Sequence, residues 1–227
     1  MSRHPRSIAP SDRRRIRTEL ERGAATLVFE RLRTRALVYL AWGSALRLNE
    51  CTRLNVAQLL EAPKTSSLAI RSMVWLRTDQ AKGRREPAKG QRQWSSAGYI
   101  VVTKRARAAL RDYLRACITR GWLQLPAAAN TPLFLATHGF QESGRKRLSD
   151  RSAQHCWHRV QARAGVAEPY HFHCLRHDAA TLFAQACDGD VFKVARFARF
   201  SVSTAQRYVH VSPTAVSELA ELASRSS

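Results

Sequence analysis

The chain has 227 residues, which is enough for one domain with a full core and too few for two large domains. Lysine and arginine total 38 against 17 acidic residues, so the formal net charge of +21 predicts a polyanionic partner, with nucleic acid first and an anionic membrane second. No apolar run reaches about 18 residues and the N-terminus lacks an apolar signal-peptide core, so we expect a cytoplasmic protein that neither spans a membrane nor is secreted.

The N-terminal region is predicted to be a helix that follows a short lead-in. Residues 1–10 are basic and contain proline, which favours a flexible segment, and residues 11–227 are expected to form one domain. Ser11 is a suitable N-cap for a helix through Glu21, and Gly23 is a suitable stop. The arginines along this helix suit a solvated basic face at least as well as a DNA contact.

Arg47 follows a predicted apolar helix at residues 32–46, where alanines and leucines recur at helical spacing. Packing and the Glu50 carboxylate would hold the Arg47 side chain while its guanidinium points outward. A salt bridge that only caps a helix explains the same pair equally well. The pair alone therefore leaves the role of Arg47 open.

The periodicity changes between residues 66 and 103, where the runs 68–70, 73–76 and 99–103 are typical of β-strands. We expect a small antiparallel sheet with a long basic loop before its last strand. A lysine on such a loop can deliver an ammonium to a leaving group, and the other cations are candidate DNA contacts. The cations of this loop are Lys82, Arg84, Arg85, Lys89 and Arg92.

A long amphipathic helix is predicted from Thr103 onward, and residues 121–148 are predicted to be mostly loop, with residues 133–135 in the core. The predicted inward face of the helix consists of Ala106, Ala109, Leu110, Tyr113, Leu114, Cys117 and Ile118. This helix is expected to be core scaffold.

Residues 144–151 form a basic, glycine-containing approach to the next helix, which Asp150 is expected to cap and Gly165 to end. We predict Ala153, Cys156, Trp157, Val160 and Ala164 on the inward face of that helix. The approach contributes three more candidate DNA contacts: Arg145, Lys146 and Arg147.

The C-terminal part is predicted to consist of short helices. One covers 176–187, another 191–200, a third begins at Ser203 and carries Tyr208, and the last opens at Pro213. The predicted buried stripe of the first is made of Ala179, Ala180, Phe183, Ala186 and Cys187.

The cysteines are five in number and widely spread, which favours reduced thiols over disulfides. Two groups offer zinc ligands: His155, Cys156 and His158, and His171, His173, Cys174 and His177. Neither has a second paired-ligand cluster at zinc-finger spacing, so we expect no metal and no cofactor. His138, His155 and His158 are interpreted as structural or surface residues.

Residues 171–210 concentrate the groups that phosphodiester chemistry needs: arginines for a phosphate, a histidine for a proton and a tyrosine hydroxyl. The sequence HCLRH at 173–177 precedes an alanine-rich helix, an Asp-Gly turn, a second helix and STAQRYVHV at 203–211. Together with Arg47-Leu48-Asn49-Glu50 and the basic hairpin, this order resembles the tyrosine recombinase, or phage integrase, family over residues 9–211.

The resemblance implies a role for each matched residue. Tyr208 would be the nucleophile, Arg47 and Arg176 would clamp the phosphate, and His173 would assist proton transfer. A hairpin lysine, Lys82 in preference to Lys89, would protonate the departing 5′ oxygen. The product would be a 3′-phosphotyrosine that needs neither metal nor ATP for religation.

Arg199 departs from the family pattern, in which a histidine or tryptophan commonly stands at this place. Arginine donates hydrogen bonds to phosphate but does not transfer protons. The alternative is that Arg199 merely faces solvent or the DNA backbone.

The resemblance further implies a mainly helical α+β fold with a small antiparallel sheet, acting on double-stranded DNA as a site-specific recombinase. By the same resemblance, we expect a homotetramer on DNA, at the bacterial nucleoid, and a catalytic domain without the family's core-binding domain. The helix from Pro213 would dock on a neighbouring protomer or on its own domain. Two alternatives stay open: a catalytically silent DNA-binding accessory protein or regulator, and a relaxase similar to type IB topoisomerases.

Overall fold

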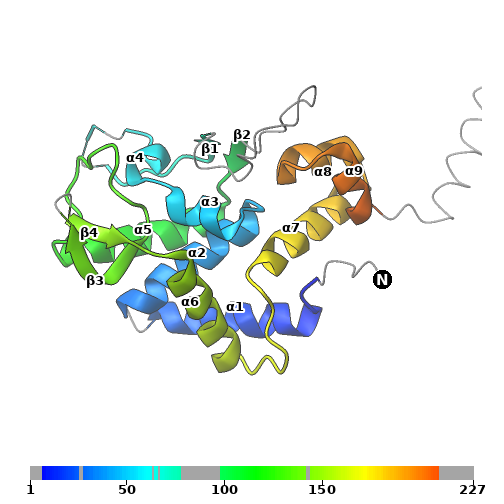
Figure 1. The fold of residues 1–227 in the computed structure, drawn as a ribbon, viewed down its shortest axis with the longest axis horizontal. Coiled ribbons are helices and arrows are strands. Elements are labelled where there is room, and N and C mark those ends of the chain that lie inside the picture. Colours follow the sequence, from blue (N-terminus) through cyan, green and yellow to red (C-terminus); the bar gives the residue numbers. More distant parts are fainter. Residues whose placement is uncertain are drawn as a thin grey trace, which may run out of the picture.

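The computed structural model describes residues 7–25, 28–62, 64–65, 67–77, 98–141 and 144–209. Most described elements are helices, and the strands form two antiparallel pairs (Figure 1). The elements of the first half are α1 (Pro10–Ala25), α2 (Phe29–Gly43), α3 (Leu48–Arg53), α4 (Val56–Leu59), β1 (Met73–Leu76), β2 (Gly98–Val101) and α5 (Lys104–Thr119). Those of the second half are β3 (Leu135–Gln141), β4 (Gly144–Arg147), α6 (Asp150–Arg163), α7 (His173–Ala186), α8 (Val191–Ala198), α9 (Val202–Ala205) and the 3₁₀ turn η1 (Gln206–Tyr208).

Helix α2 is the centre of the core and contacts α1, α5, α6 and α7. It lies in the middle of the molecule in Figure 1, with β3 and β4 towards one end and α8 and α9 towards the other. Most of its residues are buried, and from Ala36 to Trp42 every residue is buried, as expected for a helix with apolar residues on all faces of that part. At its C-terminal end, a side chain at Gly43 would come within 2.9 Å of Thr103, which caps α5. Helix α2 is the helix expected at residues 32–46, but it begins and ends three residues earlier.

The N-terminal segment is packed from residue 7 onward, which corrects the expected flexible lead-in for the part that the structure describes. Ile8 is only 1% exposed, and its backbone N–H donates to Asp178 Oδ1 at 3.2 Å. The Ala9 N–H donates to the Tyr170 hydroxyl at 3.2 Å. Helix α1 then begins at Pro10, so Ser11 is not its N-cap, and it continues through Gly23 because its buried face packs on α2.

The predicted small sheet is confirmed as an antiparallel pair of β1 and β2, in which Trp75 pairs with Tyr99. The predicted strand at 68–70 is wrong, because only Ile70 makes an isolated bridge, to Leu60. Residues 78–97, which include the basic loop, lie outside the described residues.

Helix α5 confirms the predicted amphipathic helix, with Thr103 as its N-cap. Its inward face is buried as predicted, except that Ile118 is 38% exposed. Residues 133–135 are buried, also as predicted. The loop expected after them is in part a hairpin of β3 and β4, whose register shifts between Leu135 and Phe140.

Helix α6 begins where the sequence indicated, but Ser149 is its N-cap and Asp150 is not. The Ser149 side chain accepts a hydrogen bond from the Ser152 backbone N–H, while Asp150 accepts one from the Thr52 hydroxyl at 2.6 Å. The predicted inward stripe is buried, apart from Ala164, which is half-buried. Asp150 thus joins α6 to α3.

Helix α7 begins at His173, almost one turn earlier than predicted, so His173, Arg176 and His177 lie on a single helix. Its buried stripe includes Ala184, whereas Ala186 is exposed. Tyr208 ends η1, which continues directly from α9. The predicted helix from Pro213 lies outside the described residues.

None of the five cysteines forms a disulfide in the structure. In the part of the chain that the structure describes, no helix is both long enough and apolar enough to cross a membrane.

Candidate active site

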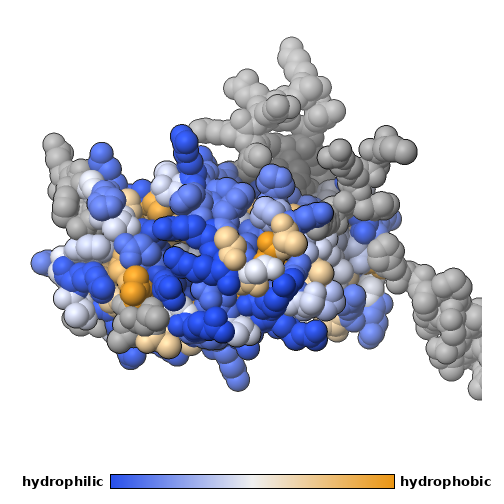
Figure 2. All heavy atoms as spheres, turned by 90° about the horizontal axis from the view of Figure 1, so that it is seen from below, coloured by the Kyte–Doolittle hydropathy of each residue, from blue (hydrophilic) through white to orange (hydrophobic). Residues whose placement is uncertain are grey.

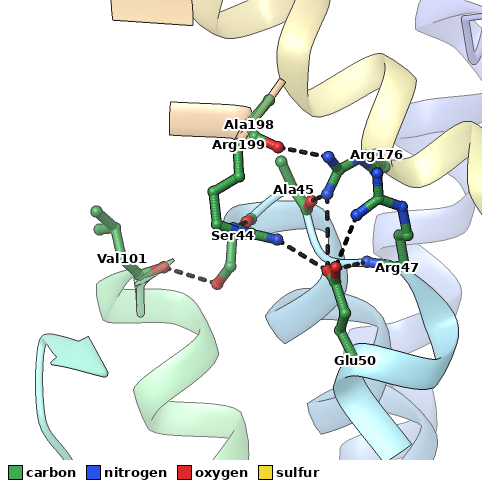
Figure 3. A network of polar contacts seen from close by, with 8 residues as sticks. All are labelled: Ser44, Ala45, Arg47, Glu50, Val101, Arg176, Ala198 and Arg199. Carbon is green, nitrogen blue, oxygen red and sulfur yellow. Dashed lines mark hydrogen bonds and ion pairs between the residues drawn. The ribbon is translucent and has the colours of Figure 1, made fainter. Parts of the chain in front are cut away.

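The site is built around the carboxylate of Glu50, which three arginines approach (Figure 3). Arg47 Nη1 lies 2.8 Å from Glu50 Oε1, and Arg199 Nη2 lies 2.8 Å from Oε2. Arg176 Nη1 lies 3.7 Å from the same Oε2. The Arg47 backbone N–H also donates to Oε2, which makes Glu50 the residue that closes the first turn of α3. Both sequence interpretations of the Arg47–Glu50 pair therefore hold: it caps a helix and holds an arginine.

Arg176 is fully buried, and its guanidinium is held by main-chain carbonyls. It donates to the carbonyls of Ala45 and Ala198, which lie at the ends of α2 and α8. Its guanidinium carbon also lies 4.5 Å from the centre of the Phe200 ring. Its Nε has no hydrogen-bond partner among the described residues. Arg176 therefore brings the C-terminal helices against the end of α2.

Arg199 points inward, which excludes the alternative that it faces solvent. It is 6% exposed, and its Nη1 donates to the Ser44 carbonyl in addition to the contact with Glu50. Its backbone adopts a left-handed conformation, with a φ of 53°, as the C-cap of α8. That turn redirects the chain so that the side chain reaches Glu50.

The site brings three positively charged guanidiniums to one negatively charged carboxylate. Burial by itself would raise the pKa of Glu50, but Arg199 and Arg176 outweigh it, so the pKa lies below its ordinary value. Burial lowers the pKa of Arg176 and Arg199, and Glu50 opposes that shift. Glu50 is therefore ionised at neutral pH, and the cluster keeps an excess of positive charge that can attract an anion.

Tyr208 is 6% exposed and has two aromatic neighbours, Phe200 and His177. Its ring centre lies 5.2 Å from that of Phe200 and 5.7 Å from that of His177, with interplanar angles of 9° and 21°. Its hydroxyl forms a hydrogen bond with Nδ1 of His177. Burial raises the pKa of Tyr208 to about 12, although Arg176 and Arg207 act in the opposite direction. The phenol is therefore neutral at physiological pH.

The two histidines of the predicted site occupy different places. His173 is exposed, and its ring meets that of His177 edge-on with the centres 4.4 Å apart. His177 lies between His173 and Tyr208, and burial, then the charges of His173 and Arg176, lower its pKa to about 4. The sequence analysis assigned proton transfer to His173 and missed the contact made by His177. The signal available was the spacing of four residues, which places both on one helix face.

The predicted DNA contacts are only partly described. Lys82, Arg84, Arg85, Lys89 and Arg92 lie outside the described residues, as does the side chain of Arg145. Lys146 is exposed.

Arg147, a predicted DNA contact, makes hydrogen bonds within the protein. Its guanidinium donates to the carbonyls of Thr52 and Leu54 at 2.7 and 2.8 Å and to the Asn55 side chain at 2.6 Å. These internal bonds use three of the five N–H donors of the guanidinium. Arg147 therefore fastens β4 to the loop between α3 and α4.

A second polar region, which the sequence analysis did not single out, is a cavity of about 840 Å³ between α1, α2, β3 and α6. Cationic and imidazole side chains line much of it: Arg31, Arg33, His138, Arg151, His155, His158, Arg159 and Arg163. Figure 2 shows the face on the side of α1 and α6, where hydrophilic side chains predominate over small, separate hydrophobic patches. The available signal was the helical spacing of Arg151, His155 and Arg159 on α6.

Within the described ranges, no group of three or more histidine, cysteine or acidic side chains is placed to hold a metal ion.

The sequence profile of the phage integrase family matches residues 14–215. The chain belongs to the phage integrase family. This confirms the resemblance inferred from the motifs. The tyrosine recombinase XerD of Bifidobacterium longum (strain NCC 2705) is 38% identical over 118 residues, which cover 48% of this chain and 34% of that protein. The chain thus matches about a third of the length of this curated family member.

Solved structures of the family share the fold. The XerA recombinase superposes with a TM-score of 0.63 at 20% identity, covering 96% of this chain and 63% of that one. The Tn1549 transposon integrase in complex with transposon right end DNA gives 0.63 at 14% identity, covering 96% and 66%. XerH bound to palindromic difH gives 0.60 at 17% identity, covering 96% and 53%. The predicted mainly helical α+β fold is confirmed.

Proposed function

We propose that the chain is the catalytic part of a site-specific DNA recombinase that cleaves and rejoins DNA strands through a 3′-phosphotyrosine at Tyr208. The observation that carries this proposal is the meeting of Arg47, Arg176 and Arg199 at Glu50. Arg176 is followed on α7 by His177, which binds the Tyr208 hydroxyl. Helix α7 thus carries both an arginine of the cluster, Arg176, and the residue that binds the nucleophile, His177.

The proposed reaction follows from these positions. The Tyr208 oxygen attacks the phosphorus, the bond to the 5′ oxygen breaks, and the phenol proton passes to His173. Lys82 gives a proton to the departing 5′ oxygen. Arg47, which is 25% exposed, is the arginine of the cluster that a phosphate reaches first, and Arg176 stabilises the charge that develops on the non-bridging oxygens. Rejoining reverses these steps, with a 5′ hydroxyl as the attacking group.

The proposed partner is double-stranded DNA. The formal charge of +21 supports it, and so does the cationic cavity beside α6, whose arginines suit backbone phosphates. The XerH and Tn1549 integrase structures are complexes with DNA. We propose assembly as a tetramer on DNA, in the cytoplasm at the nucleoid.

A second candidate function is a DNA-binding regulator that does not cleave. The observation in its favour is burial: Arg176 is 0% exposed and Tyr208 6% exposed, so both must become accessible before a phosphodiester can react. A relaxase similar to type IB topoisomerases would share the cleavage step without joining two sites.

Trapping of a covalent intermediate on a nicked DNA substrate tests the proposal. A protein–DNA adduct that is lost in Tyr208→Phe supports strand cleavage. DNA binding without any adduct favours the regulator and contradicts the recombinase. Relaxation of supercoiled DNA without recombinant products favours the relaxase.

A further inference from the structure

We propose that His177 is the positioning residue of the nucleophile: it holds the Tyr208 hydroxyl by a hydrogen bond and fixes the phenol ring. This inference rests on the proposed function, because it concerns the same tyrosine. It adds a residue to the catalytic residues predicted from the sequence, which are Arg47, Lys82, His173, Arg176, Arg199 and Tyr208.

The first support is the geometry of the three rings. The Phe200 ring lies nearly parallel to the phenol ring, with the ring centres 5.2 Å apart, while the His177 ring lies at the hydroxyl end of Tyr208 in nearly the same orientation. The hydrogen bond to Nδ1 then sets the direction of the hydroxyl. Ring contacts fix the plane of a tyrosine but not its rotation within that plane, so the His177 bond supplies the missing constraint.

The second support is that His177 and Arg176 are consecutive residues of α7. Arg176 is immobilised by the carbonyls of Ala45 and Ala198. A rigid helix turn therefore sets the position of Nδ1 relative to the guanidinium cluster. The Tyr208 hydroxyl, which is hydrogen-bonded to Nδ1, is therefore also fixed relative to the cluster. This matters because a displacement of about 1 Å at a reacting atom can slow a reaction about a hundredfold.

The third support separates positioning from proton transfer. The groups facing His177 are His173 and Arg176 from α7 and Tyr208 from η1. Burial and the two charges lower the pKa of His177 to about 4, whereas the pKa of Tyr208 is about 12. A ring with so low a pKa accepts a hydrogen bond but does not take the phenol proton. His173, which is exposed, keeps the proposed role of proton acceptor.

The test compares three variants of the full chain. His177→Ala removes the acceptor, and His177→Asn keeps an amide atom near the place of Nδ1 without a titratable ring. His171→Asn is the matched control, since His171 is an exposed histidine just before α7. One readout is the rate of adduct formation on saturating nicked DNA across pH. The other is the ¹³C NMR shift of the Tyr208 ring carbon that bears the hydroxyl, measured without DNA and assigned with Tyr208→Phe.

We expect His177→Ala to slow adduct formation at least about tenfold with unchanged DNA affinity. We expect His177→Asn to stay within about threefold of the unmodified chain with the same pH profile. Full activity of His177→Ala overturns the proposal, and so does a His177→Asn variant as slow as His177→Ala, which indicates proton transfer.

The NMR readout keeps the two proposals distinguishable. If the unmodified chain forms no adduct, the recombinase proposal fails while the contact is still tested. A Tyr208 shift that moves in His177→Ala and stays in His171→Asn supports the positioning contact. A shift that is the same in every variant overturns it.

Discussion

Glu50 and Arg199 lie 149 positions apart in the chain, yet Oε2 of the first is 2.8 Å from Nη2 of the second. Both side chains are buried, Glu50 completely. A contact of this kind is costly to break, because the remaining partner stays charged in a medium that does not solvate it. The arginine that departs from the family pattern is thus part of the site's internal structure.

Replacement of Glu50 by glutamine should destabilise the fold more than any exposed charge change. The side chain keeps its shape, but buried Arg176 and Arg199 lose their counter-charge, which should lower the free energy of unfolding by about 3–5 kcal/mol. For a domain of this size that corresponds to a melting temperature lower by roughly 10 °C. Calorimetry would measure the melting temperature of Glu50→Gln, with Glu61→Gln, a change at an exposed glutamate, as the control. Equal losses in both variants would contradict the role of Glu50.

Arg199 and Arg47 touch the same carboxylate but should respond differently to truncation. The Arg199 side chain is 5% exposed and that of Arg47 is 25% exposed. Arg199→Ala should therefore cost about 3 kcal/mol or more of stability. Arg47→Ala should cost about 1 kcal/mol or less and should weaken cleavage of DNA instead. Urea denaturation and the adduct assay together separate the two effects, and a reversed order would argue against the assigned roles.

His177 should make the stability of the folded chain depend on acid pH. Its pKa of about 4 in the folded state lies below the value of about 6.5 expected when unfolded. The unfolded chain therefore takes up a proton that the folded chain refuses, so the stabilisation present above pH 6.5 is lost as the pH falls towards 4. His177→Asn should flatten the melting temperature measured between these values. An unchanged slope would show that other groups, such as Glu50, dominate there.

Arg151 should contribute to DNA affinity through charge. It is an exposed residue of α6 that lines the cationic cavity. If it contacts one phosphate, Arg151→Ala should reduce the slope of log affinity against log salt by about 0.9. Arg115→Ala on α5 removes the same charge from an exposed position outside the cavity lining and serves as control. Fluorescence anisotropy over a salt series measures both, and identical slopes would exclude the cavity as a phosphate contact.

Arg147 should matter for stability and Lys146 should not. Arg147→Ala removes the hydrogen bonds to the Thr52 and Leu54 carbonyls and to the Asn55 side chain, and the Leu54 carbonyl then keeps only the bond from the Leu133 backbone N–H, so the loss should be about 1–3 kcal/mol. Lys146 is exposed, so Lys146→Ala should stay within about 0.5 kcal/mol of the original stability. Chemical denaturation of the two neighbours gives a direct comparison. A stable Arg147→Ala variant with weak DNA binding would restore the sequence-based assignment.

Local patterns sufficed where one element determines the outcome. The inward face of α5 repeats at helical spacing, and all of it except Ile118 is buried. Ile118 lies in the last turn of α5, one residue before the helix ends at Thr119. The Arg47–Glu50 pair was predictable for the same reason, because the two residues are three positions apart and lie within one helical turn.

Contacts between distant segments could not be predicted in this way. The position of the Arg199 side chain depends on the left-handed backbone conformation of Arg199 and on its contact with the Glu50 carboxylate of α3. The His177–Tyr208 bond depends on how η1 packs against α7, although the spacing already placed His173 and His177 on one face. The hairpin of β3 and β4 lacks a regular alternation of apolar residues, so nothing in its sequence separates it from a loop.

The fastening of Ile8 to Asp178 has a consequence for any change made at the front of the chain. Asp178 also accepts a hydrogen bond from the Trp42 indole at 2.9 Å, and it directly follows His177 on α7. The first described residues therefore hold α7, the helix that carries Arg176 and His177, through the hydrogen bond from Ile8 to Asp178. A segment fused before Ser7 would thus join the chain close to α7. Shortening the chain past Ile8 would remove the backbone donor to Asp178 and should destabilise α7.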